Sequence, residues 1–161
     1  MKKLLVSSLM IIIGLIGCTS TATESVDDTN IDLSISSMLV LALEDEYKAK
    51  ATYEVIISEY GTITPFSNIV NAEQTHIDLL LPLFDTYQIE LPDPVDKAEL
   101  SLPESISNAL ALGIQAEIDN IALYEAFLKT DIPDDIRDAF EKLMGASENH
   151  LQAFTRAYER Q

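Results

Sequence analysis

The sequence predicts an all-α protein, a bundle of four helices with a long crossover between the second helix and the third. Four long segments carry apolar residues at heptad-like steps, which is the spacing of one face of an α-helix. Two short turns and one longer, proline-containing connection separate these segments, which is typical of two helix pairs joined by a crossover. No β-rich segment competes with this assignment.

The first helix pair is expected on either side of a short turn. We expect the first helix over 37–60, where Gly61 ends it. Thr64 then fits an N-cap, and Pro65 fits the first position of a second helix over 65–87. The predicted inward positions of this pair are Leu39, Leu43, Glu46, Ala49, Tyr53, Ile57, Tyr60, Phe66, Ile69, Glu73, His76, Leu80 and Phe84.

The second helix pair follows the crossover. Pro82 is expected to kink the second helix near its end, and residues 88–102 form a connection without a regular element. At about 3.3 Å per residue this connection can span a bundle. We expect the third helix over 103–129 and the fourth over about 134–159. The predicted inward positions are Ile106, Leu110, Gly113, Glu117, Ile121, Tyr124, Leu128, Ile136, Phe140, Leu143, Ser147, His150, Phe154 and Tyr158.

The N-terminal segment has the features of an export signal. Two lysines precede an apolar run over 4–16 that is too short for a comfortable membrane span. Gly17 and Cys18, the only cysteine, follow this run, and the segment Leu15-Ile16-Gly17-Cys18 resembles the lipobox of bacterial lipoproteins. The alternative is an ordinary signal peptide with a chance cysteine. We expect a lipoprotein signal peptide over 1–17, a flexible tether over 18–36 and the helical domain over 37–161, exported to the bacterial cell envelope and anchored to the membrane through lipid on Cys18.

The composition limits the partners of this protein. The formal net charge of −17 repels nucleic acid and attracts cations, so we expect no nucleic-acid partner. With a single cysteine, no disulfide can form within the chain, and stability must come from the core. Most of the surface carboxylates are expected to serve solubility alone.

Polar residues interrupt each of the four apolar stripes, and they are of metal-ligand types. The interruptions are Glu46, Glu73 with His76, Glu117, and Ser147 with His150. Both histidines of the chain lie in these gaps. A buried carboxylate costs several kcal/mol unless it is paired or bound to a metal. The pattern therefore predicts a metal site, although a solvated helix face and a satisfied core histidine are the alternatives. The predicted ligands are Glu46, Glu73, His76, Glu117 and His150.

The two halves of the domain repeat this pattern. Tyr53 follows Glu46 at the same interval as Tyr124 follows Glu117. We expect both hydroxyls to bond the carboxylates, with Ser147 and Asn120 as further residues around the ligands. Each antiparallel pair can bring its ligands to one layer, since they lie at similar heights from the turn. A symmetric two-metal site would produce such a repeat.

At the motif level the chain resembles the ferritin-like di-iron carboxylate superfamily. The segments that resemble rubrerythrin-type proteins are Glu46-x-x-Ala49-x-x-x-Tyr53 and Ala72-Glu73-Gln74-Thr75-His76. A larger set resembles a bacterial family of ferritin-like domains of unassigned function, DUF2202-like, over about 41–157: Tyr60-Gly61, Pro65-Phe66, Asn68-Ile69, Glu73-x-x-His76, Ser147-x-x-His150-Leu151 and Ala153-Phe154. The resemblance implies a ferritin-like bundle in which Glu73 bridges two metal ions. It implies terminal ligands at Glu46, His76 and His150, and a terminal or bridging ligand at Glu117.

One position departs from the superfamily pattern. A full di-iron site has a second Glu where this chain has Ser147, and Glu148 points about 100° away around the helix. The resemblance implies one or two iron ions and O2 or H2O2 as reactants, although manganese or zinc suits the ligands equally well. It favours an envelope-anchored metal-binding protein, an iron-dependent oxidoreductase of the ferroxidase or peroxide- and O2-reducing kind. The alternatives are a binding protein with a single metal and no turnover, and a metal-free helical interaction module.

Overall fold

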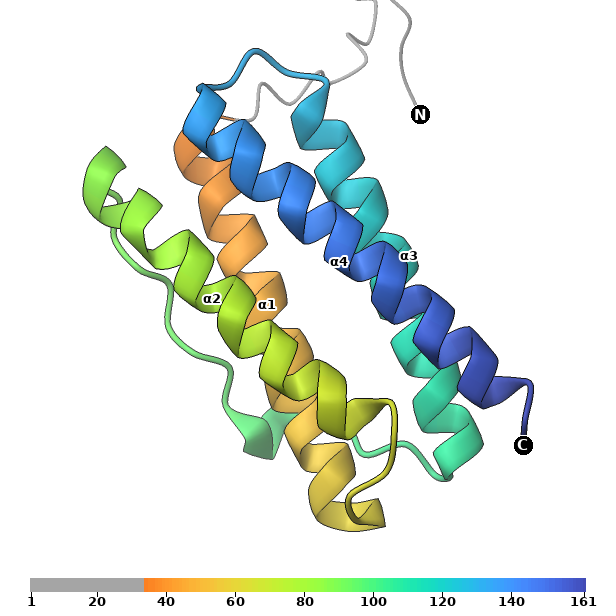
Figure 1. The fold of residues 1–161 in the computed structure, drawn as a ribbon. Helices are drawn as coiled ribbons and strands as arrows, with labels where there is room; N and C mark the ends of the chain where they lie inside the picture. The colour runs from red at the N-terminus through yellow and green to blue at the C-terminus, as the bar shows by residue number, and fades with distance from the viewer. Residues whose placement is uncertain (1–33) are drawn as a thin grey trace, which may run out of the picture. The chain divides into compact units, whose positions relative to one another are not determined.

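The computed structural model describes residues 34–161, and over this range it contains helices and no strand (Figure 1). This confirms the predicted all-α four-helix bundle with its crossover between the second and third long helices. None of the described helices is both long and apolar enough to cross a membrane. The predicted signal peptide, Cys18 and nearly all of the predicted tether lie outside the described residues. The elements are α1 (Ile35–Tyr60), α2 (Phe66–Tyr87), the 3-10 helix η1 (Lys97–Glu99), α3 (Ile106–Leu128) and α4 (Asp134–Tyr158).

Serine hydroxyls determine where two of the helices begin. The Ser34 Oγ accepts a hydrogen bond of 3.1 Å from the Ser37 N–H, so α1 begins at Ile35, slightly before the predicted start. The Ser105 Oγ caps α3 in the same way, and α3 therefore begins later than predicted. Gly61 ends α1 as expected, since its φ of 82° lies in the left-handed region that favours glycine.

The expectations for the start of α2 and for the crossover were wrong in detail. Helix α2 begins at Phe66, and Pro65 occupies the N-cap position without a side-chain hydrogen bond. The crossover is not free of regular structure, because the Asp96 side chain caps the single turn η1. The Lys97 Nζ also pairs with the Glu54 carboxylate of α1, which attaches this turn to the bundle.

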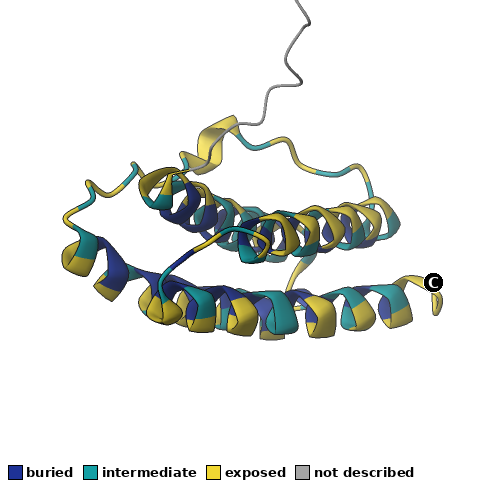
Figure 2. Ribbon diagram, turned by 90° about the horizontal axis from the view of Figure 1, so that it is seen from above, coloured by how far each residue is buried: buried dark blue, intermediate teal, exposed yellow. Residues whose placement is uncertain are grey.

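The core consists of two apolar clusters along the bundle. Helix α1 packs beside α2, and α3 packs beside α4 (Figure 1). One cluster contains Leu43, Phe84 and Phe140, and the other contains Phe66 and Phe154. In Figure 2 the buried residues lie on the helix sides that face one another. In every helix the predicted polar positions fall in the sequence between the contributions to the two clusters, so a polar layer divides the core.

Several predicted inward positions of α3 and α4 are displaced by one residue or are exposed. Asn120 and Phe127 are buried in α3, whereas Ile121 and Leu128 are only partly covered. The buried positions of α3 are separated alternately by three and four residues, which keeps them on one face of the helix. The predicted positions included two successive steps of four residues, which would turn the later positions away from that face. In the last turn of α4 the buried residue is Ala157, three residues after Phe154, whereas Tyr158 is 44% exposed.

Candidate metal centre

All five predicted ligands lie in the polar layer between the two apolar clusters. Glu46 is completely buried, Glu73 and Glu117 are 2% and 3% exposed, and the two histidines are 9% exposed. Each long helix contributes because its apolar stripe carries one polar interruption at this height. The inward stripe thus takes the carboxylates and imidazoles into the core, away from water.

The ligands form two groups that share Glu73. In the first group, the His76 Nδ1 lies 2.8 Å from the Glu73 Oε2 and 3.0 Å from the Glu46 Oε2. In the second group, the His150 Nδ1 lies 3.4 Å from the Glu73 Oε1 and 3.6 Å from the Glu117 Oε1. Within each group, one ligand atom from every residue lies within 4.8 Å of the others. Glu73 therefore presents one carboxylate oxygen to each group.

The contacts of the two imidazole Nδ1 atoms are those expected beside a bound cation. The His150 Nδ1 is buried and has no hydrogen-bond partner, which is unusual for a buried nitrogen. The His76 Nδ1 faces two carboxylate oxygens, yet an Nδ1 carries at most one proton to donate. Two carboxylate oxygens and one imidazole nitrogen in each group are ligands that suit iron, manganese or zinc.

The pKa values show how the protein compensates these buried charges with protons. Burial raises the pKa of Glu46 to about 7. Burial also acts to raise the pKa of Glu73, but interactions with His150 and His76 outweigh it and lower the pKa to about 2. Burial acts to lower the pKa of both histidines, yet their carboxylate neighbours raise it to about 10 for His76 and about 9 for His150. Without a metal ion, protonated imidazoles therefore provide the positive charge.

Two buried tyrosines hold the carboxylates from the opposite helix pair. The Tyr53 hydroxyl on α1 donates to the Glu117 Oε1 on α3 at 2.9 Å. The Tyr124 hydroxyl on α3 donates to the Glu46 Oε1 on α1 at 2.8 Å. Burial raises the pKa of both tyrosines well above 10, so both remain donors. The repeated spacing between glutamate and tyrosine in the sequence thus corresponds to two reciprocal hydrogen bonds between α1 and α3.

Ser147 and Asn120 also lie in the polar layer. Ser147 is 2% exposed on α4, one turn before His150, which is where the resemblance places a second Glu. Asn120 is 6% exposed, and its Oδ1 has no hydrogen-bond partner.

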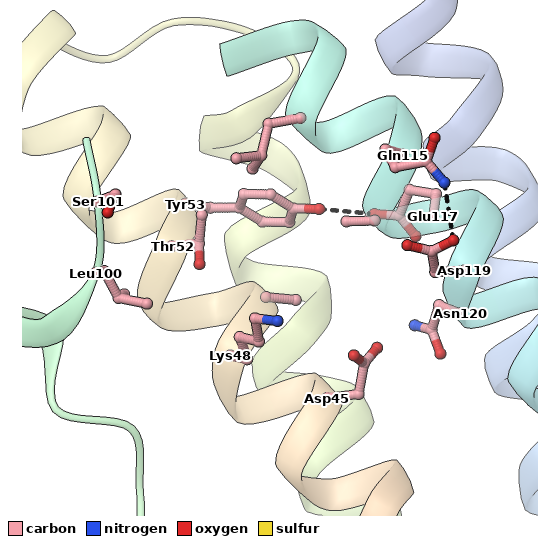
Figure 3. Close-up of a pocket in the computed structure, with 13 residues that line it drawn as sticks. Asp45, Lys48, Thr52, Tyr53, Leu100, Ser101, Gln115, Glu117, Asp119 and Asn120 are labelled. Atoms are coloured by element: carbon pink, nitrogen blue, oxygen red, sulfur yellow. Dashed lines mark hydrogen bonds between the residues drawn. The ribbon is translucent and has the colours of Figure 1, made fainter. Parts of the chain in front are cut away.

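A pocket of about 510 Å³ reaches this layer between α1 and α3. Tyr53 and Glu117 line it, and Figure 3 shows the Tyr53 hydroxyl pointing at the Glu117 carboxylate. Asp45 and Asp119 also line it, and sequence reasoning missed both. Their position in the sequence could have indicated them, because each lies within two residues of a predicted ligand and therefore close to any pocket that reaches that ligand.

The fold and the site define a class: a four-helix bundle with a buried cluster of carboxylates and histidines that could hold metal ions. The chain belongs to the family described as "Uncharacterized protein domain (DUF2202)", whose model matches residues 35–161.

One curated protein and two solved structures are similar to this chain. It is 29% identical over 135 residues to the uncharacterized protein MJ0754 of Methanocaldococcus jannaschii, covering 73% of this chain and 71% of that protein. The crystal structure of that hypothetical protein matches with a TM-score of 0.70 at 27% identity, over 78% of this chain and 79% of the other. The conserved hypothetical protein rv2844 of Mycobacterium tuberculosis matches with a TM-score of 0.62, over 75% of this chain and 94% of that one. Its 16% identity makes it a likeness of fold alone.

Proposed function

We propose that this protein is a metal-binding protein of the ferritin-like superfamily and that its centre holds iron for oxidoreductase chemistry. The observation that carries the proposal is the position of Glu73, whose two oxygens face two different groups of carboxylate and imidazole. A carboxylate buried in this way destabilises the fold unless positive charge compensates it, and its two oxygens could each face one of two metal ions.

Each residue of the centre has a defined part in this proposal. Glu46 and His76 would hold one ion, Glu117 and His150 would hold the other, and Glu73 would contribute one carboxylate oxygen to each group. When bound, iron(II) supplies electrons for the reduction of O2 or H2O2. Tyr53 and Tyr124 orient the two outer carboxylates through their hydroxyls, as hydrogen-bonded neighbours commonly orient metal ligands. The apolar clusters exclude bulk water on both sides of the layer along the bundle, and of the five candidate ligands Glu117 alone lines the pocket between α1 and α3.

A second candidate function follows from Ser147. Three carboxylates facing two divalent ions leave a net positive charge, and a serine adds none. This favours tight binding of one ion and weak binding of the other, as in a binding protein without turnover. Manganese or zinc would serve such a protein as well as iron.

We further propose that the protein acts in the bacterial cell envelope, held to the membrane by lipid on Cys18. The support is the signal-like segment and its lipobox-like ending in the sequence. The strongly acidic composition supports metal ions, with O2 or H2O2, as partners and disfavours nucleic acid.

Metal titration and O2 consumption test these proposals. Metal-free protein is titrated anaerobically with Fe(II), and bound iron is counted by elemental analysis. Glu73→Ala and His76→Ala are expected to lose most of this binding, whereas Glu148→Ala, an exposed carboxylate of α4, should bind like the wild type. Rapid O2 or H2O2 consumption by the iron-loaded protein supports the oxidoreductase. Stoichiometric binding without consumption supports the binding protein, and a wild type that binds no metal refutes both.

A further inference from the structure

The pocket between α1 and α3 is large enough for a small organic molecule. Its volume of about 510 Å³ lies within the range of pockets that bind small ligands in proteins. Much of its wall is apolar, with Ala49 from α1, Leu112 and Ala116 from α3, and Leu100 from the crossover. Such a wall favours the apolar part of an organic ligand over water alone.

The part of the wall that the crossover forms is attached to α1 on both sides of Leu100. Before Leu100, the Lys97 Nζ pairs with the Glu54 carboxylate. After it, the Tyr60 hydroxyl donates a hydrogen bond to the Pro103 carbonyl oxygen. Glu54 and Tyr60 both belong to α1. These contacts hold the wall against the bundle, so the pocket is formed without a ligand, as is usual for sites that bind small molecules.

Two polar side chains that line the pocket have no partner. Asn120 is 6% exposed, and its Oδ1 is fully buried. Figure 3 shows the Asn120 amide extending into the space between the two helices with its nitrogen on the side of Asp45. Neither this nitrogen nor the Asp45 carboxylate forms a hydrogen bond or an ion pair with another side chain of residues 34–161. An unpaired donor and an unpaired acceptor thus face one pocket, which is unusual for largely buried polar groups and indicates a ligand.

The hydrogen-bonding and the charge of the wall select the chemistry of this ligand. A hydroxyl group satisfies both side chains, because it donates one hydrogen bond and also accepts. Asp45, Glu117 and Asp119 line the pocket with negative charge. Lys48 adds one positive charge, so the wall remains net negative and disfavours an anion. An ammonium group could donate to Asp45 but could accept nothing from the amide nitrogen.

We propose that this pocket binds a small alcohol or phenol, whose hydroxyl donates to the Asp45 carboxylate and accepts from the Asn120 amide nitrogen. Its apolar body lies against the alanine and leucine side chains of the wall. The ligand lies beside Glu117 and therefore next to the proposed metal centre. Binding depends on the pocket alone, so it requires no bound metal ion.

A set of matched probes tests the proposed recognition. The full chain, metal-free and zinc-loaded, is titrated with para-fluorobenzyl alcohol, and binding is followed by fluorine NMR. We expect this alcohol to bind at least about tenfold more tightly than para-fluorotoluene, which lacks the hydroxyl, because one or two hydrogen bonds contribute a factor of this order. It should exceed para-fluorobenzoate, which is an anion, by a similar factor. The three probes share one fluorinated ring and differ in the polar group.

Two variants locate the binding site. Ala116→Leu fills the pocket and should abolish binding of the alcohol. Its matched control is Ala126→Leu, an exposed position of α3 that does not line the pocket, and this variant should bind like the wild type. Asn120→Leu removes the amide and should weaken binding about tenfold.

Several results would overturn the proposal. Equally tight binding of the toluene or the benzoate, or tighter binding of para-fluorobenzylamine, would refute recognition of a hydroxyl. Wild-type binding by Ala116→Leu would place the ligand elsewhere, and no binding of the alcohol would mean that the pocket holds only water. Failure of the metal centre is a separate result, because a protein that takes up no Fe(II) should still bind the alcohol.

Discussion

Ser147→Glu would add the carboxylate that the proposed metal centre lacks. Ser147 is 2% exposed and lies one turn before His150, so a longer acidic side chain at this position enters the polar layer. Two divalent ions would then face four carboxylates in place of three, and the site would be neutral. We expect the second ion to bind more tightly in this variant.

The size of this effect follows from the charges. A unit charge at about 4 Å from another contributes about 4 kcal/mol at an effective dielectric constant of about 20, and a divalent ion gains more. Desolvation of the new carboxylate costs several kcal/mol, which offsets much of this gain. A net gain of about 2 kcal/mol lowers the dissociation constant of the second ion about 30-fold. The added volume destabilises the metal-free protein by about 1–3 kcal/mol.

Anaerobic calorimetric titration with Fe(II) measures both binding steps. Ser147→Gln is the matched control, because it adds nearly the same volume without the charge. We expect the glutamate variant alone to show the tighter second step. If it folds and its second step equals that of the glutamine variant, Ser147 does not face the metal and the reasoning about the fourth carboxylate is wrong.

Three further predictions concern pH, packing and the N-terminus. The pKa values of His76 and His150 are raised from 6.5 to about 10 and about 9, so their contribution to the stability of the metal-free protein is complete below about pH 6.5 and is lost as the pH rises through 9–10. Urea unfolding at pH 6.5–10 should show this loss of stability in the metal-free protein. Zinc-loaded protein should lose less stability, because its imidazoles are already neutral. An unchanged unfolding midpoint in the metal-free protein would contradict the pKa shifts. Gly113→Ala should lower the free energy of unfolding by about 1–3 kcal/mol, because the added Cβ would lie 2.8 Å from the Phe154 ring. Thermal unfolding measures this change. Gly145→Ala is the control, since no atom lies within 4 Å of a Cβ added there. Cys18→Ser should move the protein from the membrane fraction to the soluble fraction, as fractionation and immunoblotting would show, and continued membrane attachment would indicate an uncleaved anchor.

The sequence determined the helices and the residue types of the centre. A helix has a fixed period, so a polar residue within an apolar stripe faces the core whatever the neighbouring helices do. Periodicity alone therefore predicts that Glu46, Glu73 and Glu117 point into the bundle. The repeat of tyrosines after two of these positions predicted hydroxyls beside carboxylates for the same reason.

Only the tertiary structure decided which of these groups meet. Periodicity gives a direction from one helix axis, but distances between helices depend on how the side chains of all four pack. The sharing of Glu73 between His76 and His150, and the crossing of Tyr53 to Glu117, depend on the relative rotation and height of different helices.

The pocket between α1 and α3 is likewise a property of packing. Small side chains such as Ala49 and Ala116 leave space there, while Leu100 of the crossover forms part of its wall. No local pattern in the sequence records that these distant segments surround one cavity, because the cavity is what remains after the larger side chains have packed. The chain thus specified the candidate ligands through local periodicity, and the arrangement of the helices specified which of these residues meet and which of them the pocket reaches.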